Sequence, residues 1–277
     1  MQFVPHNTSG HLSPFIQSIF HISQFVPDHS IQRVVPTGHI FIIFELDGFV
    51  RHTYDNETLK EQDSFTKVWI SGMHRNYISI SAHQQSEMFV IQFKPFGAYP
   101  FFHFPLEELN EKVVQAEKVL GPEILDIREK LYLAKTSQDK FAIAETWLTE
   151  RFDSQKVPTN DLYVVSKKLQ QESVTDYAEA IADYPNTQKH LIDQCKKYLG
   201  LTPKYFQRIL RFNELLQQIQ EKKSVPWSQV AYQCGYSDQS HFIKEFKHFS
   251  GFNPKEYIEQ EYNQTSDPNF FPLDKRG

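Results

Sequence analysis

A stretch near the end of the sequence repeats at a distance of 51 residues. Residues 191–206, LIDQCKKYLGLTPKYF, align with residues 242–257, FIKEFKHFSGFNPKEY, and both copies keep a glycine, a proline and two lysines at matching positions. The apolar positions also coincide, with Leu191, Cys195 and Tyr198 over Phe242, Phe246 and Phe249. Such self-similarity indicates one supersecondary unit used twice. The unit expected is a helix, a short turn and a second helix that stops at a glycine.

Turn and capping residues predict where the helices of this region begin and end. Thr187 is placed to cap a helix that ends at Gly200, because threonine favours N-caps and glycine tolerates the left-handed conformation after a helix. Pro203 suits the first turn of a long amphipathic helix that runs to Glu221, and Pro226 suits the start of a further helix.

Two more caps complete the helical prediction. Ser237 is expected to cap the last major helix, which ends at Gly251, and Ser173 with Asp176 is expected to form a capping box further upstream. No strand is expected after Leu162, so this part of the chain is predicted to be all helical.

The helix expected over residues 237–251 has two contrasting faces. On a helical wheel Phe242, Phe246 and Phe249 fall within about 60° of one another, which is typical of a core stripe. The opposite face carries Ser237, Ser240, Lys244 and Lys247, flanked by His241 and His248. Serine hydroxyls at a helix start suit phosphate oxygens, and longer side chains reach base edges.

The turn Gly235-Tyr236 before this helix predicts a helix-turn-helix unit, whose second helix enters the major groove of DNA. A lysine-bearing face opposite a phenylalanine stripe is also typical of an ordinary solvated helix. The duplication favours DNA, because two such units on one long helix would reach successive major grooves about 34 Å apart.

Residues 230–257, VAYQCGYSDQSHFIKEFKHFSGFNPKEY, resemble the signature of AraC/XylS-type transcription regulators. In that signature a glycine-aromatic-Ser turn leads into a Ser-aromatic-x3-Phe helix and a Gly-x2-Pro-x2-Tyr exit. The resemblance covers residues 161–262. It implies an all-α domain with two helix-turn-helix units joined by a long helix, double-stranded DNA and RNA polymerase as partners, and a possible homodimer.

The first of the two units departs from this pattern. Its turn contains Pro185 and no glycine, Asp193 stands where relatives commonly carry an arginine, and Cys195 replaces a bulky phenylalanine. A carboxylate at that position repels phosphates, although it can accept a hydrogen bond from a cytosine amino group. We therefore predict that the second unit supplies most of the base readout.

The candidate DNA-binding residues come from both units and from the connecting helix. They are Thr187, Gln188, Lys189, His190, Lys196, Arg208, Arg211, Ser237, Gln239, Ser240, His241, Lys244 and Lys247. Arg208 and Arg211 are expected to contact phosphate, with an intradomain salt bridge as the alternative.

The first part of the sequence changes its hydrophobic period. In HLSPFIQSIFHI, residues 11–22, apolar residues recur at helical spacing, so we expect an N-terminal helix there. Between residues 31 and 95 the runs HIFIIFEL, KVWISG, YISISAH and MFVIQFKP have a period of two and predict an antiparallel sheet or small barrel. A hairpin turn is expected near residues 84–86, and helices are expected over residues 106–152.

The polar stretch DSQKVPTND, residues 153–161, is the predicted domain boundary. The domains expected are 1–155 and 160–262, followed by a tail over 263–277. The first domain more loosely resembles the cupin-like effector or dimerisation domains of AraC/XylS-type regulators. The predicted fold class is therefore α+β, with an N-terminal antiparallel β region plus helices and a C-terminal all-α domain.

Charge, cysteines and hydropathy narrow the functional class. The net charge is −5, but residues 161–262 hold 13 Lys and Arg and 13 Asp and Glu, so the excess acid lies in residues 1–160. A neutral domain still binds phosphate when its bases share one face. With no apolar run near the roughly 18 residues that span a bilayer and no signal-peptide pattern, a cytoplasmic protein without a membrane partner is expected.

Catalytic chemistry is not expected. Cys195 and Cys234 are predicted to be small core residues, and the 12 histidines lack metal-ligand spacing, so neither a metal nor another cofactor is predicted. The aromatic stretch over residues 93–104 is expected to fill a core or to line an effector pocket. Tyr99, Phe101 and His103 are the candidate effector contacts.

These observations predict a sequence-specific DNA-binding regulator that is not an enzyme. A small-molecule effector or dimerisation through the first domain would shift the population of DNA-binding arrangements. The alternatives are a cupin-like metabolite-binding enzyme with a vestigial DNA-binding module, and a regulator without a small-molecule ligand.

Overall fold

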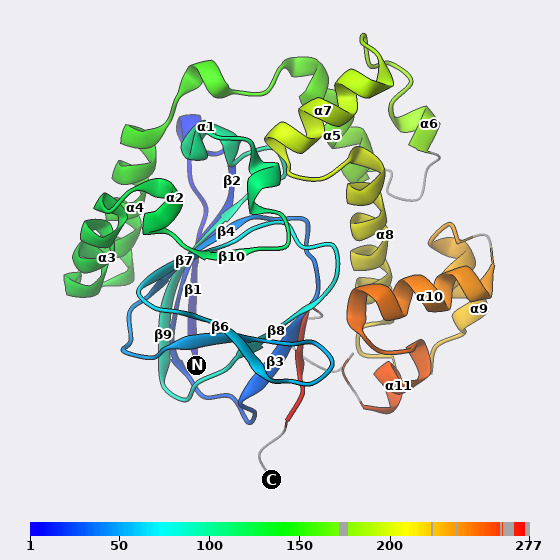
Figure 1. The fold of residues 1–277 in the computed structure, drawn as a ribbon, viewed down its shortest axis with the longest axis horizontal. Coiled ribbons are helices and arrows are strands. Elements are labelled where there is room, and N and C mark those ends of the chain that lie inside the picture. Colours follow the sequence, from blue (N-terminus) through cyan, green and yellow to red (C-terminus); the bar gives the residue numbers. More distant parts are fainter. Residues whose placement is uncertain (172–176, 223, 237, 261, 263–268, 275–277) are drawn as a thin grey trace.

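Two antiparallel β-sheets and a set of helices make up the protein (Figure 1). The computed structural model describes the chain except residues 172–176, 223, 237, 261, 263–268 and 275–277. The first sheet has the strand order β1 (Gln2–His6), β2 (Ile16–Phe25), β9 (Ser86–Phe93), β4 (Phe41–Glu45), β7 (Val68–Ser71) and β10 (Val113–Gln115). The second has the order β11 (Phe270–Pro272), β3 (Ile31–Val34), β8 (Ile78–Ser81), β5 (Arg51–Tyr54) and β6 (Glu61–Phe65).

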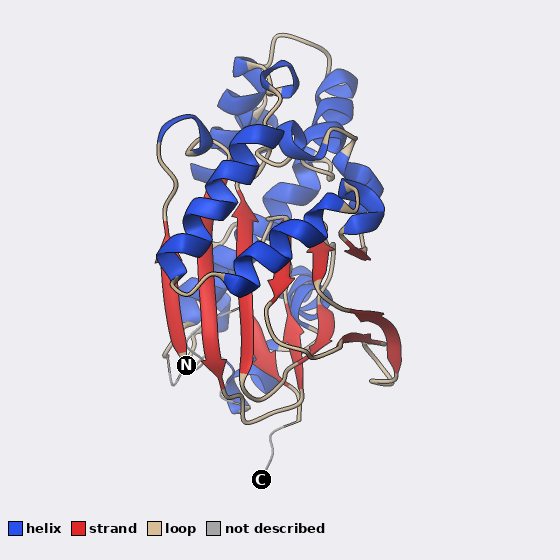
Figure 2. Ribbon diagram, turned by 90° about the vertical axis from the view of Figure 1, so that its left-hand side faces the viewer, coloured by secondary structure: helices blue, strands red, loops and turns tan. Residues whose placement is uncertain are grey.

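Helices α3 and α4 cover the outer face of the first sheet (Figure 2). The helices of this part are α1 (Tyr99–Phe102), α2 (Glu117–Leu120), α3 (Glu123–Leu133) and α4 (Ser137–Arg151), with 3-10 turns at Gly10–Leu12, Leu106–Leu109 and Ser154–Lys156. Trp147 of α4 packs edge-on against Phe44 with ring centroids 6.3 Å apart, and Phe141 lies 5.7 Å from Phe89. These aromatic contacts fix α4 on the sheet.

The central strands β4 and β9 bury both of their faces. Successive side chains of a strand point to opposite sides, so Ile42 and Phe44 join the core under α4. Phe41 and Ile43, their neighbours in the chain, belong to the other side and face the second sheet. The apolar runs of the sequence are therefore continuous because each face of the sheet meets a different partner.

The strands expected at HIFIIFEL, KVWISG, YISISAH and MFVIQFKP are confirmed as β4, β7, β8 and β9. The N-terminal helix expected over residues 11–22 is wrong, because most of this stretch forms strand β2. The register of β2 against β9 shifts between Ile16 and Ser18. This irregularity allows Ile16 and Ile19, three residues apart, to be buried on the same side, which imitates helical spacing.

The hairpin expected around residues 84–86 is also wrong. Strand β8 belongs to the second sheet and β9 to the first, so the connection between them crosses from one sheet to the other. The helix expected at LEELNEKVVQAEKVL is interrupted by strand β10, which pairs with β7. The helices expected for the rest of residues 106–152 are confirmed as α3 and α4.

The helical region after residue 160 contains the two predicted helix-turn-helix units. Its helices are α5 (Asn160–Gln171), α6 (Tyr177–Ala180), α7 (Gln188–Tyr198), α8 (Pro203–Ile219), α9 (Trp227–Gln233), α10 (Gln239–Ser250) and α11 (Pro254–Glu259). Thr187 caps α7, and Pro203 and Pro226 stand at the starts of α8 and α9, as predicted. The predicted α+β class, with β-sheets before the helical region, is confirmed.

Three predictions for this region are not confirmed. The cap of α10 is Asp238, whose side chain accepts a hydrogen bond from the His241 backbone N–H, and not Ser237. Ser237 and the capping box of Ser173 and Asp176 lie outside the described residues. The prediction that no strand follows Leu162 is wrong, because β11 pairs with β3 of the second sheet.

Candidate functional site

Helix α10 presents an exposed polar face and a buried aromatic face, as the sequence predicted. Its exposed residues include Gln239, Ser240, His241, Lys244 and Lys247. Phe242, Phe246 and Phe249 on the opposite side are at most 1% exposed. The aromatic stripe holds the helix against its neighbours, so the lysines and the polar residues remain accessible to a partner.

The turn between α9 and α10 positions this face. Gly235 has a φ of +72°, a left-handed conformation that glycine adopts without strain. Tyr236, the next residue, is buried, and its ring lies 5.4 Å from that of Phe242. The glycine therefore makes the sharp turn, and the tyrosine anchors the start of α10 to the core.

In the first unit, the start of α7 is also accessible. Thr187 Oγ1 accepts a hydrogen bond of 3.2 Å from the backbone N–H of His190, and Thr187, Gln188, Lys189 and His190 are all exposed. Asp193 is exposed as well, so the acidic residue lies on the accessible side of α7. Lys196 is half-buried, and its Nζ lies 4.0 Å from Glu107 Oε2.

Both arginines of α8 are engaged within the helical region. Arg208 Nε lies 3.0 Å from Oε2 of Glu245, a residue of α10 that is only 4% exposed, and its guanidinium stacks over Tyr205. Arg211 lies over the ring of Tyr236. Arg208 therefore neutralises a buried carboxylate of α10, which is the salt-bridge alternative of the sequence analysis.

A cavity of about 720 Å³ lies between the two sheets. Its walls are largely apolar and aromatic and include Phe20, Phe41, Ile43, Phe65, Trp69 and Val90. Strand residues of the second sheet, among them Val34 and Ile80, close the opposite side. This volume falls in the range of small-molecule sites, and such sites are mostly apolar with a few polar groups.

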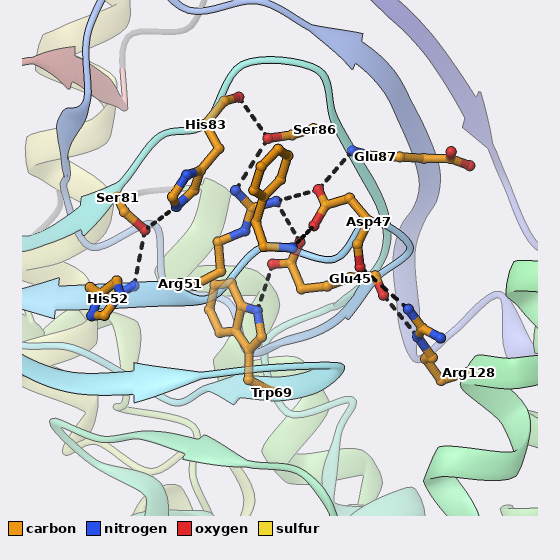
Figure 3. A network of polar contacts seen from close by, with 11 residues as sticks. Glu45, Asp47, Arg51, His52, Trp69, Ser81, His83, Ser86, Glu87 and Arg128 are labelled. Atoms are coloured by element: carbon orange, nitrogen blue, oxygen red, sulfur yellow. Dashed lines mark hydrogen bonds and ion pairs between the residues drawn. The ribbon is translucent and has the colours of Figure 1, made fainter.

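One end of the cavity carries a buried polar network (Figure 3). Arg51 Nη2 donates hydrogen bonds of 2.6 Å to Glu45 Oε2 and 2.8 Å to Asp47 Oδ2, and Nη1 donates to Ser86. Trp69 Nε1 donates to the second oxygen of Glu45 at 2.8 Å. Burial raises the pKa of Glu45, while its contacts with Arg51 act in the opposite direction.

Arg51 is 5% exposed and lines the cavity, and its Nε has no hydrogen-bond partner among the described residues. A buried polar atom without a partner is costly, so the network is not fully satisfied at this nitrogen. His74, which also lines the cavity, has its pKa lowered to about 4 by burial and is therefore neutral near pH 7.

The predicted effector residues Tyr99, Phe101 and His103 are not among the residues that line this cavity. The Phe101 ring packs against Phe15, and Tyr99 lies 4.7 Å from Tyr198 of α7. His103 Nε2 lies 3.0 Å from the carbonyl oxygen of Arg151. Tyr99 and Phe101 are buried around α1, which is the core-packing alternative for this stretch, whereas His103 is exposed.

The residues that line the cavity were not predicted from the sequence. The available signal was the continuous apolar character of β4 and β9, which indicates two buried faces but not which face encloses a hollow. Cys195 and Cys234 are buried core residues as predicted, and burial raises their pKa values to about 12 and about 11. In the part of the chain that the structure describes, no three His, Cys, Asp or Glu side chains group as metal ligands.

Two regions of the chain match known protein families. Residues 4–115 match a domain of unknown function (DUF6597), and residues 186–260 match a helix-turn-helix domain. No curated protein matches significantly. No helix among the described residues has the length and apolar character needed to cross a membrane.

Solved structures similar to this chain include ToxT from Vibrio cholerae O395, at 13% identity and a TM-score of 0.43 over 96% of this chain and 99% of ToxT. Wild-type ToxT of strain SCE256 with bound unsaturated fatty acid matches at 14% identity and a TM-score of 0.45 over 96% of each chain. The matched domain and the geometry of α7 to α10 show that the chain carries an AraC-type helix-turn-helix DNA-binding domain behind a DUF6597 domain.

Proposed function

We propose that the protein is a transcription regulator whose second helix-turn-helix unit reads DNA with the exposed face of α10. The observation that supports this most strongly is the separation of that helix into a buried phenylalanine stripe and an accessible face with Lys244 and Lys247. The first unit docks mainly through the start of α7, where Lys189 is exposed. Dimerisation and contact with RNA polymerase stay predictions of the family resemblance.

The connecting helix α8 suits two such units. Its 17 residues give a length of about 25 Å at the ordinary helical rise. With the widths of α7 and α10 added, the two units span about one turn of DNA, which is the spacing of successive major grooves. A binding site with two contacted segments on one side of the duplex is therefore expected.

Replacing Lys244 with alanine is expected to weaken binding to target DNA more than replacing Lys189. Lys244 lies in the unit with the complete turn, whereas Lys189 shares its helix with the exposed carboxylate of Asp193. Each lysine that contacts phosphate should also contribute about one unit to the slope of log affinity against log salt. Binding isotherms at about 50 to 200 mM salt measure both quantities.

Arg208→Ala is the contrasting variant for this measurement. Its ion pair with Glu245 predicts a loss of stability and little change in the salt slope. An equal or larger affinity loss for Lys189→Ala than for Lys244→Ala would contradict the proposed order of the two units.

The cavity between the sheets is the proposed effector site. Its volume, its largely apolar and aromatic walls and the few polar groups at one end support a small, largely apolar molecule. Arg51 already faces the carboxylates of Glu45 and Asp47, so an additional anion is a poor partner there. Binding would regulate DNA binding by favouring one arrangement of the two parts of the chain.

Filling the cavity tests this site. Val90→Trp places an indole in the hollow, so the affinity for a neutral apolar fluorophore, N-phenyl-1-naphthylamine, should fall by about tenfold or more, because an overfilled site excludes its ligand. The emission of the fluorophore itself, which rises when it leaves water for an apolar site, measures binding in all three proteins, because the chain already has three tryptophans and each variant adds another. Leu133→Trp, at an exposed position on α3, is the matched control and should leave the affinity unchanged.

A further inference from the structure

Residues 269–274 return from the helical region to the two-sheet part of the chain, residues 2–115, which we call the β-domain, and they extend its second sheet (Figure 1). Strand β11 pairs antiparallel with β3, with Phe271 opposite Arg33. Hydrogen bonds flank the pairing on both sides, from Val35 N to Asn269 O at 3.1 Å and from Leu273 N to Ile31 O at 2.9 Å. The segment thus covers an edge of the sheet that would otherwise be open.

The carboxylate of Asp274 anchors this segment. Its Oδ1 accepts hydrogen bonds from the backbone N–H groups of Ser30 at 3.0 Å and Ile31 at 2.6 Å. Burial alone would raise the pKa of Asp274, but these bonds hold it below its ordinary value. Charge-assisted bonds of this kind are about twice as strong as neutral ones, so they fasten the strand to the start of β3.

The two faces of β11 meet different parts of the molecule. Asn269, Phe270 and Pro272 line the cavity between the sheets. Phe271 points the other way and is fully buried, with its ring 5.2 Å from Tyr257 of α11. One short strand therefore supplies both a wall of the cavity and a core residue of the helical region.

Arg33 makes the same connection from the neighbouring strand. Its Nη1 donates a hydrogen bond of 3.1 Å to the carbonyl oxygen of Ser250, the last residue of α10, and its guanidinium stacks between Tyr77 and Phe252 at 4.0 and 4.4 Å. Gly251 is required at this point, because a Cβ there would collide with the Arg33 guanidinium. The C-terminal end of α10 thus rests on β3.

A second connection joins α8 to the cavity wall. Pro36 and Gly38 line the cavity. Asn213 Nδ2 donates to the Pro36 carbonyl oxygen at 2.9 Å, and a Cβ on Gly38 would lie 2.9 Å from the ring of Phe206. The loop after β3 therefore contacts both the hollow and the helix that joins the two helix-turn-helix units.

We propose that residues 269–274 are part of the effector site and form a clasp that holds α10 on the β-domain. A molecule in the cavity contacts Phe270 and Pro272, and the same strand carries Phe271 into the helical region. Occupancy of the cavity and closure of the clasp are therefore linked, and each stabilises the other. The inference rests on the proposed effector cavity but not on DNA binding.

Asp274→Ala in the full chain tests the clasp, with Asp63→Ala on the exposed strand β6 as the matched control. Hydrogen exchange of residues 30–35 and 250–258 should become about tenfold faster in Asp274→Ala and remain unchanged in Asp63→Ala, because only the first loses the anchor. Faster exchange at 30–35 with unchanged exchange at 250–258 would overturn the clasp, since the strand would then open without loosening the end of α10.

The link to the cavity has its own readout. Asp274→Ala should weaken the binding of N-phenyl-1-naphthylamine at least about fivefold, and the fluorophore should slow exchange at 250–258 in the unsubstituted chain. An unchanged affinity in Asp274→Ala would overturn the composite site. If Val90→Trp also left the affinity unchanged, the effector cavity itself would fail, whereas the exchange experiment would still decide the clasp.

Discussion

Phe246→Ala is expected to lower the free energy of unfolding by about 3–5 kcal/mol, the largest stability loss that we expect from a substitution in α10. The Phe246 side chain is fully buried, and its ring lies 5.6 Å from Phe212 of α8, 5.8 Å from Trp227 of α9 and 5.3 Å from Tyr257 of α11. Removing it leaves a cavity where these helices meet. Urea denaturation monitored by circular dichroism measures the loss.

Ile243→Ala is the matched control on the same helix. Ile243 is 39% exposed on the flank of the helix, outside the phenylalanine stripe, so its truncation should cost less than about 1 kcal/mol. Equal losses for the two variants would mean that α10 does not divide into a core face and an accessible face.

Arg51→Met is expected to destabilise the protein by about 3–5 kcal/mol near neutral pH, because it leaves the buried carboxylate of Glu45 without its cation. Asp47 loses the same partner. The double variant Glu45→Met with Arg51→Met should lose less than the single variant, since an apolar pair replaces the buried charges. Equal losses of stability in the single and double variants would contradict an electrostatic origin of the destabilisation.

The loss in Arg51→Met should also depend on pH. Burial raises the pKa of Glu45, and the contacts with Arg51 oppose this rise. Without Arg51 the folded-state pKa rises further above the unfolded value, so the folded protein binds the proton more tightly than the unfolded chain. The deficit should therefore be largest at neutral and higher pH and should shrink as the pH falls through the folded-state pKa. Urea denaturation of the variant at acidic and neutral pH measures this recovery.

The helix-turn-helix region was largely predictable from the sequence. Its helices are marked by local signals, such as Thr187 before α7 and Pro203 at the start of α8, and these signals act over a few residues. The cap of α10 was misassigned by one residue, because serine and aspartate are both strong caps and stand side by side at 237 and 238.

The β-domain was harder to predict, because its decisive contacts join distant residues. The irregular register of β2 gave Ile16 and Ile19 a helical spacing, and only pairing with β9 makes the segment a strand. The three residues of β11 carry too weak a local signal, since their structure depends on the edge of β3 more than 200 residues away.

The candidate DNA-binding face could likewise be predicted from the sequence, whereas the cavity could not. The face of α10 follows from one helical period, whereas the cavity needs two sheets to enclose it. Arg51 illustrates the difference, because its role depends on side chains from three other strands that meet at one end of the cavity. These are Glu45 of β4, Trp69 of β7 and Ser86 of β9.

Footprinting of the full chain on genomic promoter DNA tests the central claim, that the exposed face of α10 reads DNA. The expected result is salt-sensitive protection of two segments about one helical turn apart, with protection around one segment lost in Lys244→Ala combined with Lys247→Ala. Absence of any protected site, or protection by the double variant equal to that of the unsubstituted protein, would contradict the claim.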